Sequence, residues 1–252
     1  MSNDLKFLIE TVKSASELIT DEFEVKAKDD KGDLVTNFDY EIEKFIIDRI
    51  KCEYPEFTII SEEFNSNEGL TDNCFTIDPI DGTINFAHKI PLWAIQVACI
   101  KNGKTCAAVI YLPKLNELYS ADLNGAYLND KPIFVNKLTV DKGLYTVEGP
   151  KNIIGEYKMR NVNNNYRDFH CAAINFAFVA SGKLSATSFV WDTLWDYIPG
   201  EFIVEKAGGV IYNDVLLHIA ANSKEFLQVM LDNSSVDSEK KLEIVKKKVK
   251  HE

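Results

Sequence analysis

Residues 77–86 read Ile-Asp-Pro-Ile-Asp-Gly-Thr-Ile-Asn-Phe, and this stretch carries the strongest structural signal in the chain. Pro79 disfavours helical geometry at Asp78, so that residue is expected to be extended at the end of a strand. Asp81 follows three residues later, and Gly82 allows a tight turn beside a ligand. A helix could begin directly afterwards. The stretch therefore predicts two carboxylates that converge near free backbone N–H groups.

Such a turn has two interpretations. Carboxylate oxygens are the ligands that hard cations prefer, and the amides of a helix N-terminus suit phosphate. The alternative is a plain turn whose aspartates only cap a helix. Two β-prone runs, residues 57–60 and 74–77, end in acid, at Glu62-Glu63 and Asp78. Strands that finish in carboxylates can bring them to the same sheet edge, which favours the first interpretation.

Hydrophobic periodicity outlines the rest of the chain. Between Trp93 and Phe134, short apolar runs separated by turn signals such as Asn102-Gly103 are typical of an antiparallel meander. Helices are expected over about 4–23, 39–54, 172–181, 197–207 and from 237 onward, with a strand at 210–212. We expect one α+β domain over 1–252 in which helices sandwich the sheets, with halves of about 1–145 and 146–252.

Composition narrows the classes of partner. The 252 residues are 46% hydrophobic and carry a formal net charge of −11, which offers no general attraction to nucleic acid or anionic lipid. An anionic substrate would need a locally positive feature, such as bound metal. Five scattered cysteines without a C-x-x-C pair indicate reduced thiols. With no signal peptide or membrane span visible, we expect a cytoplasmic protein without nucleic-acid or membrane partners.

Taken together, these stretches resemble the inositol monophosphatase family, within the wider group of lithium-sensitive, magnesium-dependent phosphatases. Members carry a strand-end acidic pair, then D-P-I/L-D-G-T-x-N-F, then a distant W-D and a helix that ends in A-G-G. The chain has these motifs in the same order, at 61–63, 78–86, 195–196 and 207–209, with a matching run at 33–39. The resemblance implies a layered α-β-α-β-α sandwich, a metal-dependent phosphomonoesterase and a homodimer.

Carried over by position, the resemblance implies two magnesium ions, or three, held by Glu62, Asp78, the carbonyl of Ile80, Asp81 and Asp196. Glu62, Asp78 and Ile80 would hold one ion, and Asp78, Asp81 and Asp196 a second, while Glu62 would face a weaker third. Two metal ions suit in-line displacement at phosphorus. The alternative for Glu62 is a solvated strand end. Asp192 competes with Asp196, and counting eleven residues back from Ala207 selects Asp196.

The resemblance also implies the groups that handle water and phosphate. Thr83 paired with Asp39 would orient and deprotonate the attacking water, and the amides of Gly82 and Thr83 would hold phosphate oxygens near Asp81. The alternative for Asp39 is a purely structural cap of the helix that follows it. Lys28 matches a family lysine near the third metal, or else is a solvated loop lysine.

The substrate side departs from the family. Members that prefer inositol phosphates usually carry a glutamate seven residues before the second-motif aspartate, and this chain has Phe189 there, which cannot accept a hydroxyl proton. The turn that contacts the polyol reads His170-Cys171-Ala172, after Arg167. Phe189 and Arg167 would suit a nucleotide, with a stacked base and a second phosphate. The alternatives are a buried strand aromatic at 189 and a simple helix-start residue at 170.

The sequence therefore predicts a magnesium-dependent phosphatase for a small phosphorylated metabolite. Within that chemistry, the alternative substrates are NADP(H), adenosine 3',5'-bisphosphate and fructose 1,6-bisphosphate. A non-catalytic ligand sensor of the same fold is disfavoured because all the carboxylates and the Thr83–Asp39 pair are present. An acidic calcium-binding structural module is disfavoured because the chain has no EF-hand loop.

Overall fold

The strand, turn and helix start predicted for residues 77–86 are present as β4 (Cys74–Asp81) and α3 (Thr83–Ala87) in the computed structural model. The structure describes residues 1–28, 33–148, 165–190, 193–214 and 217–233. β4 is longer than expected, and its pairing with β5 (Ala94–Lys101) is irregular between Asp78 and Asp81. Pro79, which has no N–H to donate, lies inside that irregularity.

Gly82 makes the turn after β4 possible. Its φ of 84° lies in the left-handed region, and a Cβ there would stand 3.0 Å from the carbonyl oxygen of Leu92 and 3.3 Å from the Cβ of Cys171. Only glycine fits both the backbone conformation and this close approach. The turn therefore brings the backbone of β4 and α3 directly against the segment that begins at Cys171.

The predicted meander is the main sheet of the molecule. Within the described residues it has seven strands in the order β3-β4-β5-β6-β7-β8-β9, and among these the β3–β4 pair is the parallel one. The remaining strands are β3 (Thr58–Ser61), β6 (Lys104–Leu112), β7 (Glu117–Asp122), β8 (Gly125–Leu128) and β9 (Lys131–Pro132), with a 3₁₀ turn, η1 (Pro113–Leu115), between β6 and β7. Asn102 and Gly103 take positive φ at the β5–β6 turn, as their sequence predicts.

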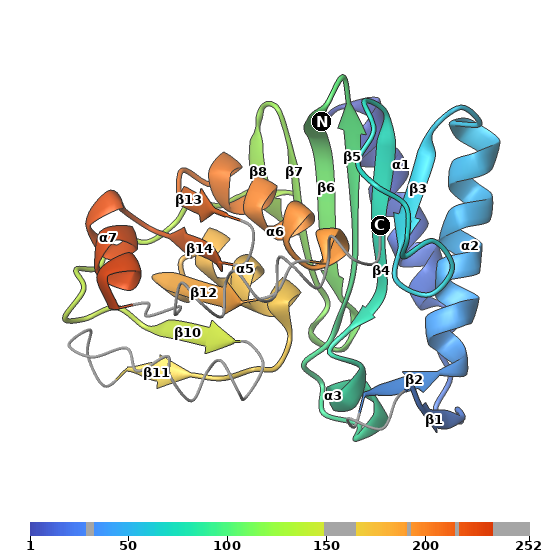
Figure 1. Ribbon diagram of the computed structural model, residues 1–252, viewed down its shortest axis with the longest axis horizontal. Helices are drawn as coiled ribbons and strands as arrows, with labels where there is room; N and C mark the ends of the chain where they lie inside the picture. Colours follow the sequence, from blue (N-terminus) through green and yellow to red (C-terminus); the bar gives the residue numbers. More distant parts are fainter. Residues whose placement is uncertain (29–32, 149–164, 191–192, 215–216, 234–252) are drawn as a thin grey trace.

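Two amphipathic helices, α1 (Asn3–Ser16) and α2 (Asn37–Glu53), cover one face of this sheet (Figure 1). α1 is shorter than the predicted helix over 4–23. Leu18 belonged to the helical pattern but is exposed, so the packing that would hold a longer helix is missing there. A short hairpin, β1 (Val25–Ala27) and β2 (Leu34–Thr36), leads into α2 instead.

The second sheet has five strands in the order β11-β10-β12-β14-β13. They are β10 (Tyr145–Glu148), β11 (Tyr166–Arg167), β12 (Ala186–Val190), β13 (Val210–Asn213) and β14 (Leu217–Ala221). Helices α5 (Ala172–Ala180) and α6 (Leu194–Lys206) lie between the sheets, and α7 (Lys224–Asn233) covers the outer face (Figure 1). This succession confirms the predicted α+β sandwich of layers α-β-α-β-α. The final helix predicted from 237 lies outside the described residues.

The apolar composition of the central helices α5 and α6 follows from their burial between the two sheets. α5 reads Ala-Ala-Ile-Asn-Phe-Ala-Phe-Val-Ala and is apolar nearly all round, as a helix between two sheets must be. α6 begins at Leu194, after the N-cap Thr193, and not at about residue 197 as predicted. Pro199 therefore lies inside the helix and not in its first turn, which corrects the prediction. Packing against both sheets overrides the local cost of a missing N–H.

No helix in the described ranges has the length and apolar character needed to cross a lipid bilayer.

Candidate active site

A cavity of about 490 Å³ opens where the two sheets and the central helices meet, a size that suits a small-molecule ligand. The turn after β4, the residues after β3, and the segments that start α5 and α6 all contribute to it. Seven of the residues predicted for the site line it: Glu62, Asp81, Gly82, Thr83, His170, Phe189 and Asp196. Asp78 lies on β4, three residues before Asp81, and is 1% exposed.

Asp78 lies near three other acidic side chains, Glu62, Asp81 and Asp196. Burial raises its pKa well above the usual value, and the charges of Glu62, Asp81 and Asp196 raise it further. Its Oδ2 accepts a long bond of 3.4 Å from the Gln96 amide, its side chain also interacts with those of Glu62 and Asp196, and its Oδ1 has no hydrogen-bond partner among the described residues. A buried carboxylate oxygen without a partner is costly, and a cation would relieve that cost.

Asp81 ties the turn after β4 to the start of α5. Its Oδ2 accepts a hydrogen bond of 2.5 Å from the backbone N–H of Ala173, in the first turn of α5. Burial raises the pKa of Asp81 to about 7, although this bond opposes the shift, and the charge of Glu148 adds to it. The carboxylate is therefore fixed in position by the backbone of the other half of the molecule.

Glu62 follows β3, which runs parallel to β4 and ends beside it. Its Oε1 accepts a bond of 2.8 Å from Nζ of Lys28, which also donates to Glu63 at 2.6 Å. Buried Glu43 of α2 fixes the loop that follows β3. Its carboxylate accepts hydrogen bonds from the backbone N–H groups of Glu63 and Phe64, at 2.8 and 2.7 Å. Lys28 is therefore an ion-pair partner of the strand end and not a freely solvated lysine.

Asp196 lies in the first turn of α6, where the positive end of the helix dipole stabilises a carboxylate. The hydroxyl of Thr193, the N-cap residue, donates to its Oδ2. Burial and the charge of Asp81 raise the pKa of Asp196 well above its usual value. Asp192, the competing residue in the sequence, lies outside the described residues.

Thr83 and Asp39 meet although 44 residues separate them. The hydroxyl of Thr83 lies 2.8 Å from the carbonyl oxygen of Ile80 and 3.3 Å from Oδ1 of Asp39. The other oxygen of Asp39 accepts the backbone N–H and the hydroxyl of Thr36, at 2.7 and 2.6 Å. Asp39 therefore serves the N-terminus of α2 and contacts Thr83 at the same time, so the two interpretations of this residue are compatible.

The residues predicted for the substrate side do not all reach the cavity. Phe189, on β12, lines it and is 8% exposed. His170 lines it as well but is largely exposed, with its ring 3.4 Å from Asp168. Arg167 is exposed, is not among the lining residues, and donates to the carbonyl of Tyr166 at 2.6 Å. In this structure Arg167 therefore does not line the cavity.

Two further acidic residues line the cavity that no motif in the sequence had indicated, Glu148 and Asp168. Glu148 ends β10 and is 8% exposed, and its Oε1 lies 3.4 Å from the backbone N of Cys171. Burial raises the pKa of Glu148, an interaction with Asn175 opposes the shift, and the charge of Asp168 adds to it. Only the pairing of strands far apart in sequence brings these carboxylates to the site.

The donor set fits magnesium. Carboxylate oxygens with a backbone carbonyl are the hard ligands that this ion takes, and the unpartnered Oδ1 of Asp78 supplies a site for one. Within the described part of the chain, no three of these side chains already stand in a ligand arrangement. Lys28 holds Oε1 of Glu62 and Thr193 holds Oδ2 of Asp196, so a metal ion would contact these carboxylates through their other oxygens or displace the two bonds.

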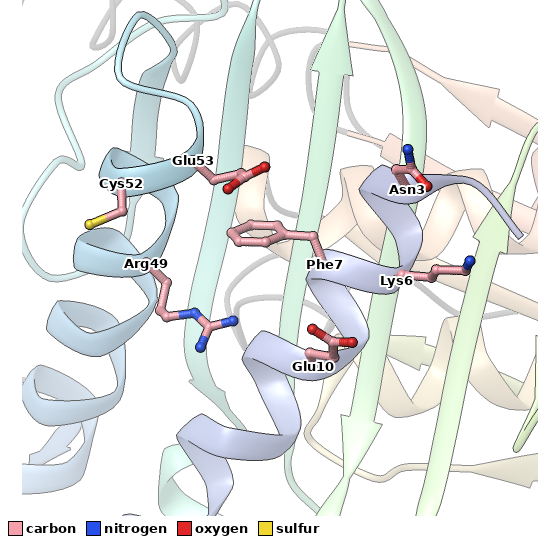
Figure 2. A pocket seen from close by; sticks show the side chains of 7 residues that line it. All are labelled: Asn3, Lys6, Phe7, Glu10, Arg49, Cys52 and Glu53. Carbon is pink, nitrogen blue, oxygen red and sulfur yellow. The ribbon is translucent and has the colours of Figure 1, made fainter.

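A second hollow, of about 440 Å³, lies between α1 and α2 on the far side of the seven-stranded sheet (Figure 2). Phe7 and Glu10 of α1 face Arg49 and Glu53 of α2 across it. The Arg49 guanidinium lies 5.9 Å from the centre of the Phe7 ring, an ordinary packing of a charged stem on an aromatic side chain. The charges that line this hollow are those of two solvent-facing helix sides, so the first cavity is the candidate active site.

Comparison with known proteins agrees with this geometry. A family model described as the inositol monophosphatase family matches residues 1–215. Nus factor SuhB of Escherichia coli is 31% identical, over 91% of this chain and 94% of its own length. Inositol monophosphatase 2 of Saccharomyces cerevisiae is 35% identical, over 73% of this chain and 71% of its own length. The solved structure of an IMPase from Thermotoga maritima superposes with a TM-score of 0.83 at 27% identity, covering 92% of this chain and 98% of that one.

The family match covers more than half of the chain, and its motifs are the ones that form the cavity. The sequence resemblance is confirmed, and the chain belongs to the inositol monophosphatase family.

Proposed function

We propose that this protein is a magnesium-dependent phosphatase that hydrolyses small phosphate monoesters, in the manner of an inositol monophosphatase. The observation that carries the proposal is the meeting of Glu62, Asp78, Asp81 and Asp196 around one buried, unpartnered carboxylate oxygen. Four carboxylates that repel one another are costly in a folded protein unless a cation joins them. Family membership supports the same activity, since the family is generally metal-dependent.

The acidic residues of the cavity would be divided among the proposed magnesium ions. Glu62, Asp78 and the carbonyl of Ile80 would hold one magnesium ion, and Asp78, Asp81 and Asp196 a second, while Glu62 would face a third. When bound, the ions supply an activated water and neutralise charge on the leaving oxygen. The bond from Ala173 keeps Asp81 oriented, whereas Gln96 makes only a long contact of 3.4 Å with Asp78. The amides of Gly82 and Thr83, at the turn into α3, would hold phosphate oxygens.

The Thr83 hydroxyl has one proton for two neighbouring acceptors. If the Ile80 carbonyl is a metal ligand, it no longer accepts this proton, and the Thr83 hydroxyl donates to Asp39 instead. The Thr83 oxygen can then take a proton from water while its own proton passes to Asp39. Burial raises the pKa of Asp39 to about 7, opposed by its bonds from Thr36. A carboxylate with a pKa near the working pH is well suited to act as the base of such a pair.

Thr83→Ala is expected to lower the rate of phosphate release by about 10²- to 10⁴-fold, the usual contribution of acid–base catalysis. The measurement uses inositol 1-phosphate, NADP, adenosine 3',5'-bisphosphate and fructose 1,6-bisphosphate, each with magnesium and with EDTA. Thr71→Ala is the matched control, because Thr71 is exposed and bonds only its own loop. A wild-type protein that binds magnesium but releases no phosphate from any of these esters would favour the ligand-sensor alternative.

Metal binding and protonation should compete at the site. Asp39 and Asp81 have pKa values raised to about 7 from 3.8, so the folded, metal-free protein binds protons that the unfolded chain releases above about pH 4. Its stability should therefore fall as the pH rises from about 4 to 7. Magnesium at about 100 times its Kd should add about 2.7 kcal/mol, or roughly 5–10 °C in Tm.

Differential scanning fluorimetry in EDTA and in magnesium at pH 5.5 and pH 8 tests this pair of effects. We expect the magnesium-induced rise in Tm to be larger at pH 8, where fewer protons compete for the carboxylates. An equal rise at both pH values would show that magnesium binds elsewhere on the protein. Homodimer formation remains a prediction of the family resemblance, and cytoplasmic location remains a prediction from the sequence composition.

A further inference from the structure

His218 is a buried polar side chain of the second sheet, and neither the proposed metal site nor the water-activating pair uses it. It lies on β14 and is 1% exposed. The antiparallel pairing of β12 and β14 places it opposite Phe189, which lines the cavity. Residues opposite each other project to the same face of a sheet, so His218 is on the side of the central helices, one strand away from the cavity.

Two side chains of α6 contact the His218 ring. Its Nδ1 lies 2.9 Å from Oε1 of Glu201, and because an ionised carboxylate only accepts hydrogen bonds, Nδ1 is the donor. The Tyr197 ring stacks on the imidazole, with centroids 4.0 Å apart and planes inclined by 26°. The other nitrogen, Nε2, has no hydrogen-bond partner among the described residues. In this part of the chain, His218 therefore directs its hydrogen bond at α6.

The two contacted residues lie in the same two turns of α6 as Asp196. Tyr197 directly follows Asp196, and Glu201 comes four residues after Tyr197, so both lie on one side of the helix. Asp196, about 100° around the helix axis, lines the cavity. Any rotation or sliding of α6 against β14 would therefore move the carboxylate of Asp196.

The contact with His218 adds a directional restraint to a helix that packs largely through apolar side chains. Trp195, Phe202 and Ile203 of α6 belong to the core between the sheets. Apolar packing has no preferred direction, whereas a hydrogen bond restricts both distance and angle. Glu201 is also held from β13, since the Asn213 amide donates to its two oxygens at 3.2 and 2.9 Å. The carboxylate of Glu201 therefore links α6 to two strands of the second sheet.

We propose that His218 is a positioning residue for Asp196. Through Glu201 and Tyr197, it holds the first two turns of α6 so that the Asp196 carboxylate meets the other acids of the cavity. The inference rests on the proposed magnesium-dependent function and adds to it a residue that touches neither metal nor substrate. Its loss should weaken magnesium binding and turnover without changing the substrate contacts.

The test measures the magnesium Kd, kcat and KM of His218→Phe. Phenylalanine keeps a ring that can stack on Tyr197 but has no N–H for Glu201. We expect magnesium, followed by its effect on Tm and thus without substrate, to bind about 10-fold more weakly, the lower end of the range for groups that orient metal ligands. For the ester that the wild type hydrolyses fastest, kcat should fall about 10- to 100-fold. KM should stay within about threefold.

Variants of Glu201 show whether the effect runs through α6. Glu201→Gln keeps an oxygen that accepts from Nδ1 and should hold the magnesium Kd within about threefold of the wild type. Glu201→Leu removes the acceptor and should weaken magnesium binding at least as much as His218→Phe. The double variant should be no worse than Glu201→Leu alone, because both changes break the same contact. Glu201 is partly exposed, so its variants decide the matter even where His218→Phe does not fold.

Tyr54→Phe is the matched control. It also keeps a ring and loses a hydrogen bond to a carboxylate, here the bond of 2.7 Å to Asp4, which joins α2 to α1 on the far face of the seven-stranded sheet (Figure 1). We expect this variant to lower Tm in EDTA by an amount similar to that for His218→Phe. Its magnesium Kd and kcat should equal those of the wild type.

The outcomes distinguish the role of His218 from the function on which it rests. If His218→Phe and Glu201→Leu lowered Tm in EDTA but left the magnesium Kd and kcat unchanged, His218 would only support the fold, and the inference would be overturned. A wild-type protein that binds magnesium but releases no phosphate would overturn the proposed phosphatase activity, while the Kd values would still decide the role of His218. A wild-type protein that binds no magnesium would overturn both.

Discussion

Asp78→Asn is expected to lower phosphate release at least about 1,000-fold, the effect of removing several kcal/mol of charge stabilisation at a metal centre. In EDTA, the same variant is expected to be as stable as the wild type or more stable. Asp78 is the carboxylate that both proposed magnesium sites share, so the two ions lose a common ligand at once. Asparagine keeps the shape and one oxygen but removes the charge that holds them together.

The expected gain in stability follows from the environment of Asp78. The side chain is 1% exposed, its Oδ1 has no partner among the described residues, and Glu62, Asp81 and Asp196 act on it with charges of the same sign. A neutral amide at this position removes three repulsive interactions from the metal-free protein. Function and stability therefore oppose each other at this residue.

Activity assays and thermal unfolding at pH 8, in EDTA and in magnesium, check both halves of the prediction. Asp72→Asn makes the same change at an exposed loop position and should leave activity, stability and the magnesium response unaltered. A variant that loses activity and is also clearly less stable in EDTA would mean that Asp78 supports the fold, and its loss of activity could then come from local unfolding.

The sequence alone predicted the parts of the site whose geometry is local. Pro79 and Gly82 fix the backbone between β4 and α3 by sterics that act within a few residues, so the turn and its two aspartates could be read directly. Asn102-Gly103 predicted its hairpin for the same reason. The layered fold followed from the resemblance, because the same motifs in the same order imply the same scaffold.

The parts that were missed depend on contacts between distant segments. Glu148 reaches the cavity only because β10 pairs with β12, some 40 residues later in the chain, and no local pattern marks that register. Glu43 reads as an ordinary polar residue of an amphipathic helix, yet it is fully buried and holds the loop beside Glu62. The predicted start of α6 at about residue 197 is too late, because packing on both sides holds Pro199 within a helix that begins at Leu194.

The second large effect is expected at Gly200, where α6 crosses α5 between the two sheets. A Cβ added there would stand 2.4–2.5 Å from three atoms of Phe176, and that side chain is fully buried. The strain of such overpacking is about 3 kcal/mol, while alanine gains only about 1 kcal/mol in helix propensity over glycine. Gly200→Ala should therefore lose at least about 2 kcal/mol of stability, or roughly 4–8 °C in Tm.

The same substitution should also reach the active site, because α6 carries Asp196 in its first turn and α5 supplies the amide that holds Asp81. To relieve the contact, the two helices must move apart, which separates these two carboxylates. A displacement of about 1 Å at a catalytic centre can cost about 100-fold in rate. We therefore expect Gly200→Ala to lower kcat together with Tm, and to weaken the magnesium-induced rise in Tm.

Gly69→Ala is the matched control, because a Cβ at Gly69 meets nothing within 4 Å and its backbone takes no positive φ. That variant should keep the Tm, the activity and the magnesium response of the wild type. If Gly200→Ala lowered Tm alone and left kcat and the magnesium response unchanged, the spacing of α5 and α6 would matter for folding but not for the metal site. The positions of Asp81 and Asp196 would then be set by the strand and turn that precede each of them, and not by the packing of the central helix layer.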